Sequence, residues 1–480
     1  MKRSKKLMTG LIALVIAVGF VALSCAGGAG RQDVGFGSSH DVVVIGAGGA
    51  GLSAAIAARE AGADVVVFEK MGIAGGNTVR ATGGMNAAGT RYQADRGIND
   101  SAELFFEDTM RGGGDINDPV LVQIMVDGSA SAIEWLSDMG ADLSDVGRLG
   151  GASVNRAHRP TGGGMVGPEV TATLVRRVQE MGIPLIIGAE VTEITSRGGR
   201  VTGVQLTYQG RRHTVSADSV ILASGGFGAN NPMAASFDPQ VLGFDTTNQP
   251  GATGGGIRMA ERVGAGLVHM EWIQTHPTHA PDREMITEAV RGNGAIMTSR
   301  EGQRFVDEMG FRDLVSERIL AQPGGSAFLV FDDSVRASLA VINAYIARGF
   351  VYQADTPQEL AVLLGATDGG AAMAATIASY NQAVASGNDA AFGRTSMPRS
   401  LSEPPFFAIE VVPAIHHTMG GVTIDTETRV LAANGNPIPG FYAAGEVVGG
   451  IHGNNRLGGN AMIDIIVFGR IAGANAAAGR

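Results

Sequence analysis

The chain contains a single cysteine, Cys25, and only four lysines among its 480 residues. One cysteine excludes a disulfide within the chain, a Cys-x-x-Cys-His haem-attachment motif and an iron–sulfur cluster held by several cysteines. Three of the lysines lie within the first six residues, which leaves Lys70 as the only one in the remainder. Schiff-base chemistry on a lysine is therefore disfavoured, and the cationic side chains of a binding site must come from arginine.

Positive charge is scarce as well. The formal net charge is −10 at pH 7, and the first 25 residues contribute four cationic side chains and no acid, so the rest of the chain is more acidic still. This balance argues against a nucleic acid as partner, because a polyanion attracts cationic surfaces. Glycine is abundant, with 72 residues in a chain that is 45% hydrophobic. Such a composition favours a folded protein with many tight strand-to-helix turns, and the length suffices for two domains.

The N-terminal segment has the pattern of a bacterial export signal. Residues 1–6 are positively charged, and the apolar run that follows is too short to span a bilayer comfortably. Cys25 stands where a lipoprotein signal carries its lipid-modified cysteine, although Ala22 occupies a position where a large aliphatic residue is usual. We expect a lipoprotein-type signal peptide over 1–25, a tether over 26–39, and export to the periplasm with a lipid anchor on Cys25. An ordinary cleaved signal peptide and an uncleaved anchor are the alternatives.

A nucleotide-binding signature follows. Residues 42–45, after Asp41, are a β-branched apolar run, typical of a buried parallel strand, and the alanine-rich stretch after Gly51 is typical of a helix. Between them, the glycines of 46–51 let the backbone turn tightly and approach a pyrophosphate at the helix N-terminus. A second strand, 64–68, ends at Glu69, about 20 residues beyond the glycines, where a carboxylate can accept hydrogen bonds from ribose hydroxyls. This order of strand, turn, helix, strand and acid predicts a dinucleotide site.

Further glycine-rich segments favour FAD over NAD. Two of them, 75–78 and 81–86, come directly after the second strand, and such backbone can lie flat against an isoalloxazine ring. A third, 224–228, follows an apolar strand, and a fourth, 441–446, lies near the C-terminus. The cofactor domain is therefore assembled from both ends of the chain, and the segment between its halves is inserted.

Three tracts in the second half of the chain place cationic side chains among glycines. They lie at 276–294, 416–421 and 452–460, and Arg312 lies between the first two. Two or three arginines with two histidines suit a dicarboxylate, because a guanidinium holds a carboxylate through two parallel charge-assisted hydrogen bonds. Together with the dinucleotide signature, the tracts predict an enzyme that acts on a small anionic substrate.

These motifs resemble the flavoprotein subunit family of fumarate reductases and succinate dehydrogenases, and above all the flavin and capping domains of the soluble, periplasmic flavocytochrome c type of fumarate reductase. The resemblance extends from His40 to the C-terminus. It implies an α/β fold in which a Rossmann-like FAD-binding domain, split in sequence between 40–290 and 414–480, carries an inserted α+β capping domain over 291–413. FAD would be bound non-covalently, and the cap would close over the substrate.

The resemblance also implies catalytic and substrate-binding roles. Arg312 matches the arginine that protonates the substrate, while Glu288 and Arg291 match the relay that returns a proton to it. One substrate carboxylate would be held by His276 and Thr287, and the other by His417 and Arg456. A hydride from flavin N5 would reach one alkene carbon while Arg312 protonates its neighbour. Each residue alone could be structural, but the occurrence of all of them in order favours the catalytic interpretation.

An FAD-binding set follows from the same match, and no metal ligand is expected. The set comprises Gly46, Gly48, Gly49, Ala50, Gly51, Glu69, Lys70, Asn77, Thr78, Gly83, Gly84, Met85, Val191, Ala223, Ser224, Gly225, Gly445, Glu446, Leu457 and Gly458. Two positions depart from the family pattern on the cofactor side. Gly255 stands where the family usually has an aspartate, and Ile463 where it often has a serine.

The predicted reaction is FAD-dependent reduction of the C=C bond of an α,β-unsaturated carboxylate, with fumarate to succinate as the first candidate. Urocanate, acrylate, methacrylate or a cinnamate are alternative substrates for the same chemistry. An exported flavin or electron carrier without catalytic activity is an alternative of another class, which the presence of Glu288, Arg291 and Arg312 argues against. Electrons would arrive from a separate donor protein, either a cytochrome or an FMN protein.

Overall fold

In the computed structural model, which describes residues 35–280 and 284–479, five parallel strands form the sheet that carries the glycine-rich turn. Their order is β19-β9-β1-β2-β6, with β1 (Ser39–Ile45) in the centre. Val43 of β1 lies opposite Val66 on one side and Val220 on the other. The run 42–45 is buried because helices cover the sheet, as a parallel sheet requires. The bounds of its partners are β2 (Val65–Glu69), β6 (Leu185–Ile187), β9 (Arg211–Leu222) and β19 (Pro437–Ala443).

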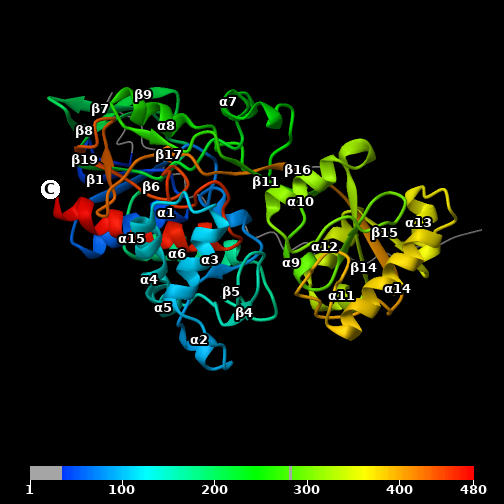
Figure 1. Cartoon of the computed structure of the whole chain (residues 1–480). Coiled ribbons are helices and arrows are strands. Elements are labelled where there is room, and N and C mark those ends of the chain that lie inside the picture. Colours follow the sequence, from blue (N-terminus) through cyan, green and yellow to red (C-terminus); the bar gives the residue numbers. More distant parts are fainter. Residues whose placement is uncertain (1–34, 281–283, 480) are drawn as a thin grey trace, which may run out of the picture. The chain divides into compact units, whose positions relative to one another are not determined.

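Two helices from opposite ends of the chain pack on this sheet. α1 (Gly49–Glu60) follows β1, and α15 (Asn460–Ala478) is the last helix of the chain. They share the most extensive helix–helix contact among the described residues, and Figure 1 shows their blue and red ribbons beside β1. α15 is long and apolar enough to cross a membrane, but two thirds of it is buried inside the protein, as expected for a core helix. Segments far apart in the sequence thus pack on one sheet.

Antiparallel strands are added to this sheet at β9 and at β19. The hairpin β7 (Glu190–Arg197) and β8 (Arg200–Tyr208) pairs with β9, while β18 (Arg429–Leu431) pairs with β19. Short strands form two further small sheets, namely β3 (Met85–Asn86), β5 (Ala157–Arg159) and β4 (Asp145–Gly147), and β10 (Leu267–Val268) with β17 (Gly421–Val422). The mixed α/β class with a parallel sheet, predicted from the sequence, is confirmed.

A second large sheet is organised around β16 (Phe406–Thr418), a strand of 13 residues. Its C-terminal half pairs with β11 (Ile273–Ala280), and its N-terminal half with β14 (Ala327–Asp332) and β15 (Val351–Ala354). β12 (Glu284–Met285) and β13 (Ile296–Thr298) complete the sheet. A hydrophobic cluster between Ala280 and Val411 covers it, in which the rings of Phe331 and Phe407 stack at 5.4 Å between centroids.

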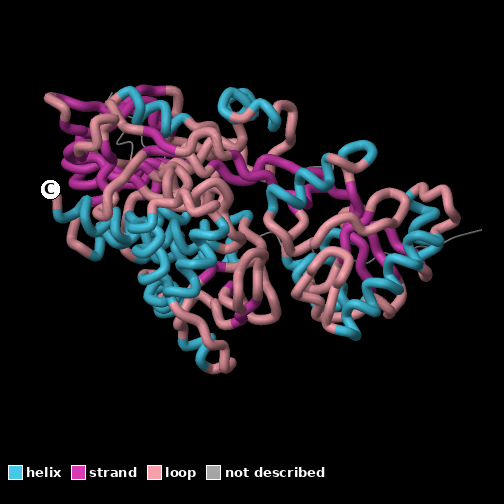
Figure 2. Tube along the Cα trace, viewed as in Figure 1, coloured by secondary structure: helices cyan, strands magenta, loops and turns pink. Residues whose placement is uncertain are grey.

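The remaining helices are distributed over both sheets (Figure 2). Several begin at side-chain caps: the Thr356 hydroxyl accepts from the Glu359 N–H, and the Asp332 carboxylate accepts from the Val335 N–H. The bounds are α2 (Arg91–Ala94), α3 (Ala102–Gly112), α4 (Pro119–Asp127), α5 (Ser129–Asp138), α6 (Val166–Glu180), α7 (Asn231–Phe237), α8 (Gly255–Arg262), α9 (Ala289–Gly292), α10 (Arg312–Leu320), α11 (Asp333–Ser338), α12 (Val341–Ala347), α13 (Pro357–Leu364) and α14 (Ala371–Ser386).

The predicted signal peptide, with Cys25, lies outside the described residues. Most of the predicted tether does too, and of its last residues Phe36 is buried against the ring of Phe68 at 5.1 Å. Residues from Phe36 onward form one unit. The predicted boundaries of the capping domain at 291 and 413 stay a prediction.

Candidate active site

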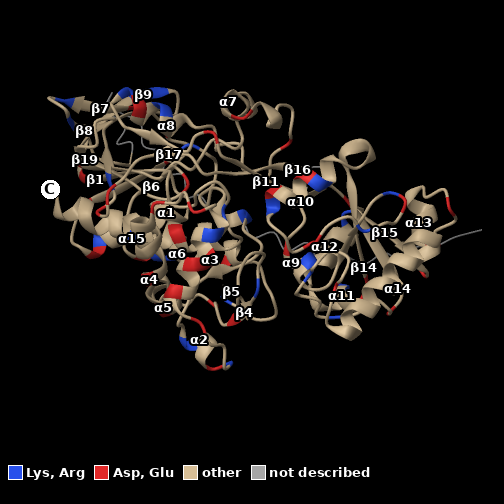
Figure 3. Ribbon diagram, in the orientation of Figure 1, with Lys and Arg blue, Asp and Glu red and all other residues tan. Residues whose placement is uncertain are grey.

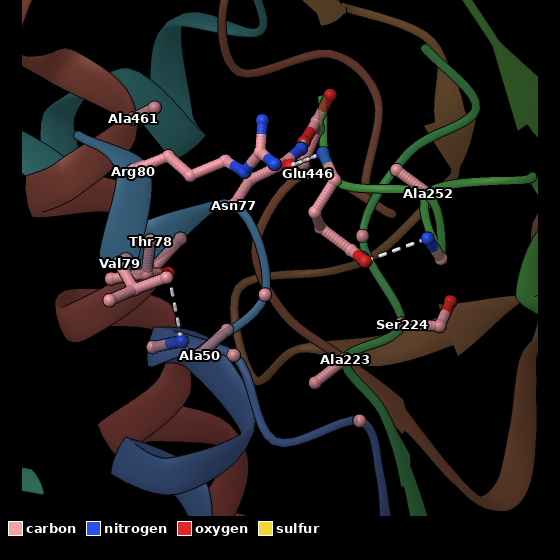
Figure 4. A pocket seen from close by; sticks show the side chains of 18 of the residues that line it. Ala50, Asn77, Thr78, Val79, Arg80, Ala223, Ser224, Ala252, Glu446 and Ala461 are labelled. Atoms are coloured by element: carbon pink, nitrogen blue, oxygen red, sulfur yellow. Dashed lines mark hydrogen bonds between the residues drawn. The ribbon is translucent and has the colours of Figure 1, made fainter. Parts of the chain in front are cut away.

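The turn between β1 and α1 leaves no space for a side chain at Gly46 or Gly51. Gly46 has a φ of 101°, and a Cβ there would lie 2.5 Å from the Ala223 carbonyl oxygen. A Cβ on Gly51 would lie 1.9 Å from the Gly46 carbonyl oxygen. Only glycine therefore permits this turn, which exposes the first N–H groups of α1, although Gly49 N–H already donates to the Thr78 hydroxyl at 2.9 Å (Figure 4). This geometry fits a pyrophosphate, as the sequence predicted.

Glu69, at the end of β2, connects the turn to the expected ribose site. Its carboxylate accepts from the Ala47 N–H and from the Met71 N–H, each at 2.8 Å. The residue is 6% exposed and lines the cavity described below. The two backbone bonds fix the carboxylate, and its remaining lone pairs can accept the hydroxyls of a ribose.

A cavity of about 790 Å³ begins at the glycine turn and extends to the cationic tracts. Figure 4 shows labelled residues from several segments, among them Ala50, Asn77, Ala223 and Glu446, around this space. Of the predicted FAD-binding residues, those that line it are Gly46, Gly48, Gly49, Ala50, Glu69, Lys70, Asn77, Thr78, Gly83, Gly84, Val191, Ala223, Ser224, Gly225 and Glu446. The glycine turn, the Glu69 carboxylate at the expected ribose site, and the extent of the cavity from the turn to the cationic tracts fit FAD.

Five predicted cofactor residues do not line the cavity. Gly51 and Gly445 lie behind its wall, where a Cβ on Gly445 would be 2.9 Å from that of Ala50. The Gly458 carbonyl accepts from the Asn86 side chain at 2.8 Å, and Met85 and Leu457 are buried. These residues shape the wall from behind rather than face the cavity.

Other lining residues were not predicted. Gln249 and Thr253 come from the loop before α8, Arg258 and Arg262 from α8 itself, and Arg80 from the segment after Asn77. Thr253 also accepts from Lys70 Nζ at 3.1 Å. Their positions follow from how the loop before α8 folds back on the cavity, and no local motif marks them.

Two guanidinium groups meet at Gln274, a residue of β11 that the sequence analysis missed. Gln274 Oε1 accepts from Arg312 Nη1 at 3.3 Å and from Arg456 Nη2 at 3.0 Å. Its Nε2 donates to the Arg456 carbonyl at 2.7 Å. The shared acceptor holds two like charges close together in a buried place, and both arginines line the cavity. Such a pair suits an anionic ligand.

Glu288 joins Arg312 to Arg291. Glu288 Oε2 accepts from Arg312 Nη2 at 2.6 Å and from Arg312 Nε at 2.8 Å, and Oε1 accepts from the Gly150 N–H at 2.7 Å. Arg291 Nη2 lies 3.6 Å from Oε2 on the far side. Burial alone would raise the pKa of Glu288, but Arg312, Arg291 and the Gly150 N–H outweigh it and lower the pKa to about 2. Figure 3 shows acidic and basic residues together at α9 and α10, which carry these arginines.

Three histidines line the same end of the cavity: His276, His416 and His417. Burial lowers the pKa of each well below 6.5, and the arginine charges nearby lower it further. The rings of His276 and His416 lie 4.9 Å apart, and the His416 Nδ1 is 2.7 Å from the Thr247 hydroxyl. All three are therefore neutral at pH 7, and each can donate one ring N–H to a carboxylate.

Of the seven predicted catalytic and substrate-binding residues, Thr287 and Arg291 do not line the cavity. The Thr287 hydroxyl accepts from the Ala289 N–H at 3.3 Å, and its own N–H donates to the Tyr345 hydroxyl at 3.2 Å. Arg291 is 1% exposed, on the side of Glu288 away from the cavity. The other five line the cavity, namely Arg312, Glu288, His276, His417 and Arg456.

The electrostatics of this end of the cavity favour a dianion. Burial, assisted by the charge of Arg312, lowers the pKa of Arg456 to about 9. The charges of Glu446, Glu288 and Asp464 oppose this shift, but among the described residues none of these carboxylates forms a salt bridge with Arg456, and Glu288 is engaged by Arg312 and Arg291. A ligand with two carboxylates would supply negative charge to both Arg456 and Arg312. The fold and the cavity therefore define a dinucleotide-binding enzyme with a cationic substrate chamber.

Comparison with known proteins narrows this class. Residues 41–462 match the family described as FAD binding domain. The chain is 52% identical over 441 residues to a fumarate reductase (cytochrome) from Shewanella frigidimarina, covering 91% of this chain and 77% of that protein. It is 48% identical to an NADH:fumarate oxidoreductase from Klebsiella pneumoniae (92% and 48% covered) and 36% identical to a urocanate reductase from Eggerthella lenta (91% and 74%).

The solved structures agree. The open conformation of a flavocytochrome c3 fumarate reductase superposes with a TM-score of 0.78 at 43% identity, covering 92% of this chain and 78% of that one. The chain belongs to the FAD-dependent flavoprotein family of fumarate reductases and succinate dehydrogenases, as its motifs predicted. It is an FAD-dependent oxidoreductase.

Proposed function

We propose that the protein reduces the C=C bond of an α,β-unsaturated dicarboxylate, fumarate to succinate, with non-covalently bound FAD. The observation that carries the proposal is the Arg312–Gln274–Arg456 arrangement, which lies with Glu288 in the same cavity as the glycine turn. Non-covalent binding is carried over from the resemblance to the soluble, periplasmic type of fumarate reductase; the lining includes His276, His416 and His417, to which a covalently attached flavin could be bound. Acid precipitation should release the flavin into the supernatant.

Two pairs of residues would hold the substrate carboxylates. His417 and Arg456 reach one of them, with His417 as a neutral donor. His276, which lies two residues after Gln274 in β11 and lines the cavity, would bind the other. Thr287 lies behind the wall, so we assign it a supporting role near His276. Binding at both ends places the alkene across the chamber and fixes its orientation, which is the main contribution of such contacts to the rate.

When bound, reduced FAD supplies the hydride. Arg312 delivers the proton to the neighbouring carbon, and this arginine already donates two hydrogen bonds to Glu288. A guanidinium has a pKa of about 12.5 or higher, so it gives up a proton only to a strongly basic carbon in a chamber that excludes water. With its pKa lowered to about 2, Glu288 is ionised at neutral pH. It can therefore accept a proton from the Arg291 side and return it to Arg312.

Electrons would come from a separate donor protein, a cytochrome or an FMN protein. The chain has no Cys-x-x-Cys-His motif, and it aligns with 77% of the Shewanella protein whose name includes a cytochrome. We also propose that the chain is exported and anchored in the periplasm through lipidated Cys25. This rests on the charged and apolar pattern of the first 25 residues.

Steady-state reduction tests the proposal. The FAD-loaded protein is given reduced methyl viologen with fumarate, urocanate, acrylate or methacrylate, alongside Arg312→Ala. Arg318→Ala, an exposed position on the same helix, is the charge-matched control. Rapid turnover of fumarate, lost only in Arg312→Ala, supports both substrate and proton donor. Turnover of only urocanate or a monocarboxylate would reject fumarate as the substrate but retain C=C reduction as the reaction. No turnover of any acid by FAD-loaded protein would favour a carrier.

A further inference from the structure

A buried ionic cluster lies behind the proton relay, and its members are Arg394, Glu308, Arg304 and Asp389. We propose that Arg394 is a positioning residue: together with Glu308 it fixes Arg291 at the distance from Glu288 that proton return to Arg312 requires. This inference rests on the proposed function, because it assigns a purpose to residues that support Arg291.

Arg394 holds the main chain of the relay. It is 1% exposed, and its Nη2 donates to the Arg291 carbonyl oxygen at 2.6 Å. Its Nη1 donates to the Ala295 carbonyl at 2.9 Å and to Glu308 Oε2 at 3.0 Å. Arg394 thus ties two carbonyls, one inside α9 and one three residues after its end, to one carboxylate. α9 has only four residues, too few for its own hydrogen bonds to fix it.

Glu308 holds Arg291 a second time, through its main chain. The Glu308 carbonyl oxygen accepts from Arg291 Nη1 at 2.6 Å. The Glu308 carboxylate is itself fixed, because Oε1 accepts from the Met297 N–H at 3.0 Å and from Arg304 Nε at 2.8 Å. Arg394 therefore binds the Arg291 carbonyl, and Glu308, the ion-pair partner of Arg394, binds the Arg291 guanidinium.

The other two nitrogens of the Arg291 guanidinium form no hydrogen bond within the described structure. Within the described structure, its Nε and Nη2 are buried and make no hydrogen bond, while Nη2 lies 3.6 Å from Glu288 Oε2. That separation is just beyond a hydrogen bond, so a small approach would make one. Buried donors without partners are costly, and their cost here is consistent with a group that changes partners during turnover. Its resting position then depends on Nη1 and the Arg394 fork.

The outer half of the cluster offers a matched control. Arg304 Nη2 donates to Asp389 Oδ2 at 3.0 Å and to Glu308 Oε2 at 2.8 Å. Arg304 is as cationic as Arg394 and nearly as buried, but within the described part of the chain its side chain donates to the two carboxylates and not to Arg291. If the cluster only stabilised the fold, replacing Arg394 or Arg304 would have the same effect on catalysis.

The test compares Arg394→Lys with Arg304→Lys in the FAD-loaded full-length protein. Lysine keeps the charge but cannot bridge the Arg291 and Ala295 carbonyls and Glu308 at once. We expect Arg394→Lys to lower kcat for fumarate by about tenfold to 100-fold, as misplacement of a supporting group does, with KM little changed. The solvent deuterium isotope effect should rise, because proton return becomes limiting. Arg304→Lys should lower the melting temperature to a similar extent but change kcat and the isotope effect much less, because Arg304 reaches Arg291 only indirectly, through the Glu308 carboxylate that the Met297 N–H and Arg394 also bind.

Equal kcat and isotope effects in the two lysine variants would overturn the proposal and leave the cluster a structural one. If Arg394→Lys does not fold, Glu308→Gln tests the same link, since it retains the carbonyl that binds Arg291 but loses the charge that holds Arg394. Arg291→Met distinguishes a failure of the proposed proton relay from a failure of the proposed role of Arg394. If Arg291→Met keeps full activity, the relay itself fails; if it is slow while Arg394→Lys is normal, only the positioning role fails.

Discussion

Gln274 shows how one neutral side chain can organise a charged site. Its Oε1 accepts from two arginines, and its Nε2 is anchored by the Arg456 carbonyl and by Asn455 Oδ1 at 2.5 Å. A carboxylate in its place would neutralise the chamber, whereas an amide holds the guanidiniums and leaves their charge for the substrate. The Gln274 amide therefore positions the two guanidiniums without neutralising their charge.

Replacing Gln274 by leucine should weaken both the fold and substrate binding. Two buried guanidiniums lose a shared acceptor, at a cost of about 1–3 kcal/mol in the free energy of unfolding. We expect the KM for fumarate to rise about tenfold or more, since Arg312 and Arg456 are no longer aligned. Urea denaturation and steady-state kinetics measure the two effects. Unchanged KM would show that the arginines are held without Gln274.

Among the secondary-structure elements, those built from local patterns were predictable. The strand, the glycine turn, α1 and the strand ending at Glu69 lie where the sequence placed them, because an apolar run and a glycine turn impose their own backbone geometry. The cationic tracts were predictable as a group by resemblance. Local patterns did not show that Arg291 and Thr287 lie behind the wall rather than on it.

The residues that sequence analysis missed depend on contacts between distant parts of the chain. Gln274 meets Arg456 across a separation of 182 residues, and Arg394 reaches the Arg291 carbonyl across 103. The residues next to Gln274 and Arg394 in the sequence do not indicate these long-range contacts. Arg258 and Arg262 belong to the same class, since they line the cavity only because of where α8 packs.

The packing of α15 on α1 depends on small residues at their crossing. A Cβ on Gly473 would lie 2.1 Å from the Ala54 carbonyl oxygen, so Gly473→Val must push the helices apart. We expect a loss of about 2–4 kcal/mol of stability and weaker FAD retention, because α1 carries the glycine turn. Ala474→Val, at the next and exposed position, is the control and should be close to neutral. Similar melting temperatures and FAD content in both variants would contradict this packing.

For the molecule as a whole, buried neutral histidines determine how stability responds to acid. The folded protein keeps the pKa of four histidines below the usual 6.5, and for His158 it is about 4; the others are His276, His416 and His417. Below pH 6.5 the unfolded chain binds protons that the folded chain does not, so the free energy of unfolding decreases as pH falls. The carboxylate of Glu288 adds a loss from pH 4.5 down to about 2.

The melting temperature should therefore fall steadily between pH 7 and pH 5. Each histidine costs up to about 1.4 kcal/mol per pH unit in this range. Saturating succinate should raise the melting temperature, since it binds the folded chamber only. Differential scanning fluorimetry of the FAD-loaded protein across this range measures both. A flat profile from pH 7 to pH 5 would show that these histidines are charged or exposed in the folded state.

The most direct measurement is a single turnover of the pre-reduced, FAD-loaded protein mixed anaerobically with fumarate in a stopped-flow instrument, with succinate quantified in the quenched mixture. We predict complete reoxidation of the flavin with one succinate formed per FAD, and reoxidation slowed by several orders of magnitude in Arg312→Ala. Flavin that stays reduced in the presence of fumarate, or that is reoxidised without succinate, would contradict the proposed reaction. Equal rates in the variant would contradict Arg312 as the proton donor.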